Sequence, residues 1–74
     1  MLPEIVDKPM ALRCFRFLDN LRASGRVNMF GAAMYLEVSQ GVNSKTARAI
    51  LGSWLETFAP NTAAEDRVEQ AFAA

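Results

Sequence analysis

The segment Asn28-Met-Phe-Gly-Ala-Ala-Met-Tyr-Leu-Glu-Val-Ser-Gln-Gly41 decides how the rest of the chain folds. A capping asparagine starts it and a glycine ends it, so the pattern predicts a helix over about 29–40. Hydrophobic residues cover nearly its whole circumference: one face has Met29, Ala32, Ala33 and Leu36, and most of the remainder has Phe30, Met34, Tyr35 and Val38. Such a helix is buried on more than one side, so other elements or another chain are expected to cover it.

The rest of the chain also shows helical periodicity, which predicts an all-α fold. Local signals set the expected helix ends: Asp7 caps the first helix, Gly25 ends it, and Pro60 stops the third. The expected architecture is a small bundle of three main helices, about 8–24, 29–40 and 44–59, plus a short C-terminal helix at about 63–73.

Each flanking helix has one apolar stripe that is predicted to form the core. The first helix contributes Met10, Ala11, Cys14, Phe17, Leu18 and Leu21, with Phe15 at the margin. The third contributes Ala47, Ile50, Leu51, Trp54, Leu55 and Phe58, and begins with Asn43 or Ser44 as its cap. The fourth contributes Ala64, Val68, Ala71 and Phe72, after a capping box formed by Thr62 and Glu65.

The length of 74 residues predicts one domain, residues 1–74, with residues 1–6 as an extended N-terminal arm. Cys14 is the single cysteine, so no internal disulfide can form, and its place on an apolar stripe predicts a core residue. No apolar run approaches the roughly 20 residues that cross a bilayer. We expect a cytoplasmic protein without a membrane partner, in a domain small enough to gain from self-association.

Charge is unevenly spread although the net charge is zero. Residues 8–48 contain seven basic and two acidic side chains, a net charge of +5, whereas the two flanks together carry −5. A basic centre between acidic ends favours an acidic partner, although a solvated mixed surface gives the same pattern.

The composition argues against catalysis. Without histidine the chain has no side chain that titrates near neutral pH, and no carboxylate pair is forced onto one apolar face. A lone thiol makes no zinc site, and the four glycines do not form a phosphate-binding loop. We therefore expect no enzyme activity, no cofactor and no metal.

The first functional hypothesis is a protein-interaction module. The apolar excess at Phe30, Met34, Tyr35 and Val38 has no obvious cover from three short helices, and uncovered patches of this kind mark interfaces or homodimers. The alternative is that the N-terminal arm and the fourth helix fold back over these four side chains.

The second hypothesis is a helix-turn-helix that binds DNA. Gly41 would be the turn glycine, and Asn43, Ser44, Lys45 and Arg48 would point from the start of the next helix toward bases and phosphates. Glu37 and Gln40 depart from the usual pattern, which has a small and an apolar residue at these positions. Helix-glycine-helix is also the ordinary way in which small bundles turn.

One resemblance covers about half of the chain. It is carried by Ser24-Gly25-Arg26-Val27-Asn28-Met29-Phe30-Gly31-Ala32-Ala33, then Tyr35-Leu36, Gly41, Ala47-Arg48, Leu51 and Trp54-Leu55. These residues resemble a group of small phage and prophage proteins with a Ser-Gly-x-x-Asn-Met-Phe-Gly-Ala segment. The resemblance implies a phage context, the cytoplasm of a host cell, and an inhibitor or modulator that binds a host or phage protein. It implies no catalytic residue.

Overall fold

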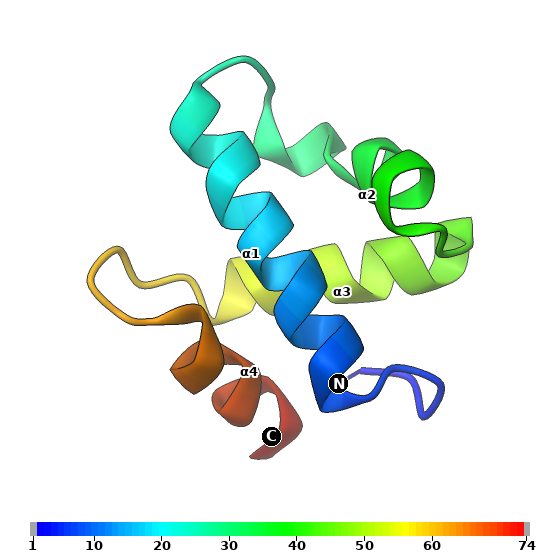
Figure 1. The fold of residues 1–74 in the computed structure, drawn as a ribbon, viewed down its shortest axis with the longest axis vertical. Coiled ribbons are helices and arrows are strands. Elements are labelled where there is room, and N and C mark those ends of the chain that lie inside the picture. Colours follow the sequence, from blue (N-terminus) through cyan, green and yellow to red (C-terminus); the bar gives the residue numbers. More distant parts are fainter. Residues whose placement is uncertain (1, 74) are drawn as a thin grey trace.

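The computed structural model describes residues 2–73; Met1 of the arm and Ala74 of the predicted domain lie outside the described residues. Residues 2–73 contain helices and no β-strand, which confirms the predicted all-α class. In chain order the elements are α1 (Lys8–Ser24), the 3-10 turn η1 (Met29–Gly31), α2 (Ala33–Gln40), α3 (Ser44–Glu56) and α4 (Ala64–Ala73). Helices α1 and α3 cross near the centre of Figure 1, with α2 at one end of the molecule and α4 at the other.

Helix α1 has the predicted limits because local hydrogen bonds fix both of its ends. The Asp7 Oδ1 atom accepts a hydrogen bond from a backbone N–H of the first turn at 2.9 Å. Gly25 ends the helix in the left-handed conformation, with φ at 68°. The buried face is wider than predicted: Phe15 is fully buried, and Phe17 is only partly buried. The reason is that both α3 and α4 pack against α1.

The predicted helix over 29–40 is divided in two. The Asn28 side chain accepts from the Phe30 N–H at 3.0 Å, and the Asn28 carbonyl accepts from the Gly31 N–H at 2.9 Å. These short-range bonds form the 3-10 turn, and Ala32 then links it to α2. Within α2 only Leu36 is buried, so the expectation that this segment is buried on more than one side is wrong for the single chain.

Helix α3 begins at its predicted asparagine cap but ends at Glu56, three residues early. The Trp54 carbonyl, which would accept the next helical bond, accepts from the Arg67 side chain at 2.9 Å. The Phe58 N–H turns instead to the Leu55 carbonyl at 3.3 Å. A long-range contact therefore replaces the last turn that the sequence predicts.

Helix α4 begins at Ala64, and the predicted capping box is wrong. The Ala63 carbonyl accepts the first helical bond, from the Arg67 N–H at 3.2 Å, so Ala63 holds the cap position. Thr62 lies one residue before the cap. A capping box needs a glutamate three residues after the cap residue, and Glu65 is only two residues after Ala63.

The core takes side chains from all four helices and from the arm. Those with no accessible surface at all are Ala11, Cys14, Phe15, Leu18, Ala32, Leu36, Ala47 and Ile50. Trp54 is 1% exposed and Val6 of the arm 3%. The arm is not extended throughout, because the Val6 N–H donates to the Pro3 carbonyl at 3.0 Å and closes a turn.

Candidate functional site

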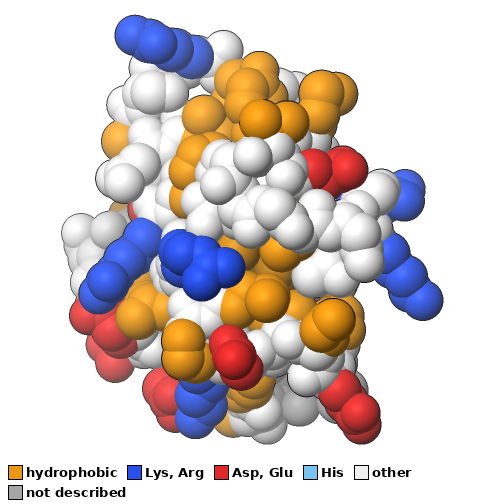
Figure 2. Space-filling view, turned by 45° about the vertical axis from the view of Figure 1, so that its right-hand side comes forward, with side chains coloured by type: hydrophobic (Ala, Val, Ile, Leu, Met, Phe, Trp, Pro, Cys, Tyr) orange, Lys and Arg blue, Asp and Glu red, His pale blue; other side chains and the backbone are white. Residues whose placement is uncertain are grey.

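Four large apolar side chains lie exposed on η1 and α2. Val38 is 85% exposed, Phe30 79%, Met34 68% and Tyr35 45%. The space-filling view shows hydrophobic side chains gathered near the top, at the height of η1 and α2 (Figure 2). We call these four residues the α2 patch. They are the residues that the sequence predicts as a protein interface.

Neither the arm nor α4 covers the α2 patch. Helix α4 packs on α1 at the opposite end of the molecule (Figure 1). In the arm, Ile5 helps to line a hollow of about 150 Å³ beside the turn from α2 to α3. The intramolecular cover that the sequence allows is therefore not formed.

The turn from α2 to α3 has the short form of a helix-turn-helix connection. It spans residues 41–43, and Gly41 adopts the left-handed conformation with φ at 69°. Gln40, a departure from the usual pattern, is half-buried and accepts from the Arg13 Nε atom at 2.8 Å. The polar side chain thus ties the end of α2 to α1.

The four residues predicted to bind DNA lie together at the start of α3, and all four are exposed. Asn43 caps the helix through a 2.8 Å bond from the Thr46 N–H. Ser44 accepts from the Arg48 guanidinium at 2.9 Å. Lys45 and Arg48 are exposed and form none of the ion pairs among the described residues.

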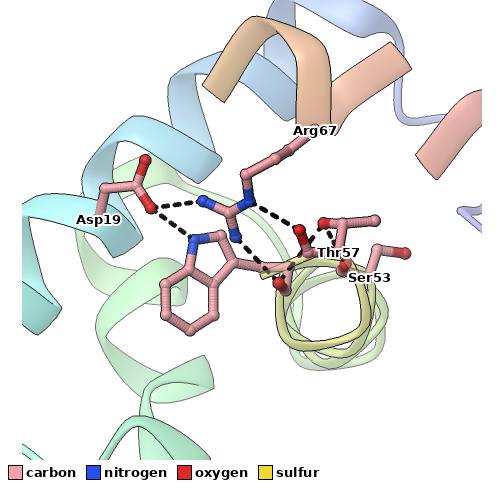
Figure 3. Close-up of polar contacts among 5 residues, drawn as sticks. Asp19, Ser53, Thr57 and Arg67 are labelled. Atoms are coloured by element: carbon pink, nitrogen blue, oxygen red, sulfur yellow. Dashed lines mark hydrogen bonds and ion pairs between the residues drawn. The ribbon is translucent and has the colours of Figure 1, made fainter. Parts of the chain in front are cut away.

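A second cluster, which the sequence analysis missed, is fully paired. Arg67 of α4 is 1% exposed, and its guanidinium donates to Asp19 at 2.7 Å. It also donates to the carbonyls of Trp54 at 2.9 Å and Thr57 at 3.1 Å. The Trp54 indole N–H donates to the same Asp19 oxygen at 2.9 Å (Figure 3). We call Asp19, Trp54 and Arg67 the polar hub.

Aromatic rings and a helix end complete the surroundings of the hub. The Arg67 guanidinium lies 5.1–5.5 Å from the ring centroids of Phe58, Trp54 and Phe15. It also lies at the C-terminal end of α3, where a positive charge is favoured by the helix dipole. The hub therefore fastens α4 and α1 to α3. Every donor in it has a partner within the chain, which is typical of a structural site rather than a binding site.

One signal in the sequence could have located Arg67. It lies three residues after Ala64 and four before Ala71, on the predicted apolar stripe, and small neighbours leave room for a guanidinium. Its partner Asp19 is 48 residues away in the sequence, and no local pattern joins the two.

Cys14 is a core residue, as predicted from its position. Burial raises the pKa of its thiol, and the Arg13 charge lowers it by a smaller amount. The thiolate is the reactive form, so the structure makes this cysteine inert.

Of the three surface hollows described, the two larger have about 300 Å³, between α1 and α4, and about 240 Å³, beside the hub. Sites for small molecules have about 300–1,000 Å³, so the first hollow reaches only the lower end of this range. Over residues 2–73, no three His, Cys, Asp or Glu side chains gather closely enough to hold a metal ion.

No protein-family model, curated protein or solved structure matches the chain. Within the described part of the chain, none of the helices has the length and apolar character needed to cross a membrane.

Proposed function

We propose that the chain is a non-enzymatic binding module that contacts another protein through the α2 patch. The exposure of four large apolar side chains on η1 and α2 carries the proposal. Single exposed hydrophobic residues are ordinary on protein surfaces, but a contiguous group is typical of an interface. Methionine and aromatic side chains are also enriched at the centres of interfaces, and lysine and glutamate are depleted there.

The size of the α2 patch supports this proposal. Taking roughly 150–200 Å² for each side chain, from the lower part of the range for aromatic residues, the four exposed fractions correspond to about 500 Å². The largest patch on an ordinary monomer has about 300–600 Å² and is often functional. In the phage context that the resemblance implies, the partner is a host or phage protein, or another copy of the chain.

Photo-crosslinking in the producing cell tests this proposal. A photoreactive residue at Met34 should give covalent adducts to protein, and a second substitution, Val38→Lys, should abolish them. A matched probe at Glu56, which is exposed on α3, should give none. Equal labelling from positions 34 and 56, or none from either, would exclude the α2 patch as a contact surface.

DNA binding is the second candidate, favoured by the glycine turn and by the exposed charges of Lys45 and Arg48. It predicts an affinity for generic duplex DNA that falls steeply with salt. The Lys45→Ala/Arg48→Ala double variant should lose this binding. The Arg22→Ala/Arg26→Ala variant, which removes the same charge elsewhere, should retain it. Absence of binding at low salt would remove this candidate.

A further inference from the structure

The shape of the α2 patch restricts what can cover it. Met34 and Val38 lie four residues apart on the same face of α2, Phe30 precedes them on η1, and Tyr35 follows Met34 in the chain. The four side chains are 45–85% exposed and line none of the three hollows described, so they protrude from the surface instead of lining a pocket. A ridge of residues four apart packs into the groove beside an equivalent ridge on another helix.

From this arrangement we propose that a second copy of the chain covers the α2 patch. This inference rests on the proposed protein-binding function. The two α2 helices pack antiparallel across a twofold axis that passes beside Met34. Met34 then meets the Met34 of the second copy, and Phe30 meets its Val38. Such an interface is self-complementary, as a twofold interface has to be.

The available area suits a dimer. Two copies would bury about 1,000 Å² from the four side chains alone, near the lower limit for a specific interface. Neighbouring residues of η1 and α2 add to this area. The net charge of zero means that two copies do not repel one another.

Sedimentation equilibrium of the purified chain tests the dimer. The wild type should have twice the monomer mass at high concentration, with reversible dissociation on dilution. Val38→Lys should weaken dimerisation at least about tenfold, because it places an unpaired charge against Phe30 of the other copy at both ends of the interface. Ser39→Lys places the same charge on the next exposed residue of α2 and should have a much smaller effect. A wild type that stays monomeric overturns the proposal.

A charge-pair variant tests the twofold arrangement. Phe30→Lys and Val38→Glu should each weaken the dimer about tenfold or more, because each buries an unpaired charge twice. Combining both in one chain places each lysine opposite the glutamate of the other copy and should restore most of the affinity. A double variant weaker than both single variants would overturn the antiparallel arrangement.

The two proposals can fail separately. A monomeric purified chain, together with adducts of a foreign protein from position 34 in cells, would overturn the dimer and leave the binding function in place. Absence of adducts from position 34 would remove both.

Discussion

The polar hub and the α2 patch have opposite surroundings for their side chains. In the hub, a charged guanidinium is buried and every nitrogen has a partner, so the helices around it are held in one arrangement. In the α2 patch, large apolar side chains are 45–85% exposed, and neither the arm nor α4 covers them. The difference separates what this sequence uses to fold from what it leaves available for a partner.

The largest expected effect comes from the aromatic member of the hub. Trp54→Ala should lower the free energy of unfolding by about 3–5 kcal/mol, because it opens a cavity under α1, α3 and α4. The free energy of unfolding of a domain of this size is only a few kcal/mol, so the variant should be largely unfolded. Urea denaturation followed by circular dichroism measures this. A variant with the wild-type midpoint would mean that Trp54 is not the centre of the core.

Removal of the buried charge comes next. Arg67→Ala should cost about 3 kcal/mol, since it leaves the Asp19 carboxylate without its charged partner and removes the Arg67 donor from the carbonyls of Trp54 and Thr57. Asp19 is about one-third exposed, so water compensates part of the loss. The exposed pair of Arg16 and Glu65 is the matched control, and Arg16→Ala should cost less than about 1 kcal/mol. Equal midpoints for the two variants would contradict the role given to the hub.

The thiol in the core has a smaller effect, which depends on pH. Because the pKa of Cys14 is raised in the folded state, the folded chain retains a proton that the unfolded chain has released. Stability should therefore fall as the pH rises above the ordinary thiol pKa, and Cys14→Ala should remove this part of the fall. Urea midpoints of both proteins at neutral and alkaline pH measure the difference. Parallel profiles would show that the thiol does not titrate differently on folding.

The α2 patch should contribute almost nothing to the stability of the single chain. At concentrations where the chain is monomeric, Met34→Lys and Val38→Lys should change the free energy of unfolding by no more than about 0.5 kcal/mol. Denaturation of dilute protein checks this. A large loss would mean that the patch is part of the core, and the contrast with the hub would disappear.

Local signals made much of the fold predictable. Asp7, Gly25, Asn43 and Gly41 act on their immediate neighbours, and the helix limits that they set are observed. The four core positions of α3 that are most buried follow one helical stripe, which the sequence displays without interruption.

Contacts between distant segments account for two of the errors. Helix α3 stops early because Arg67 takes the Trp54 carbonyl, and Phe15 is buried because α4 lies against the second side of α1. The candidate site shows the same limit. Helical periodicity identified Phe30, Met34, Tyr35 and Val38 as apolar side chains that the other predicted helices do not obviously cover. Whether the arm or α4 covers them depends on where those elements pack, which the sequence left open.

The most direct test of the central claim is an NMR dilution series on the ¹⁵N-labelled chain. We predict that the backbone amide signals of Phe30, Met34, Tyr35 and Val38 shift with protein concentration, as the α2 patch becomes covered. The indole signal of Trp54 should stay in place, because the hub is complete within one chain. Concentration-dependent shifts confined to residues 43–48, or none anywhere, would contradict the claim that this chain associates through α2.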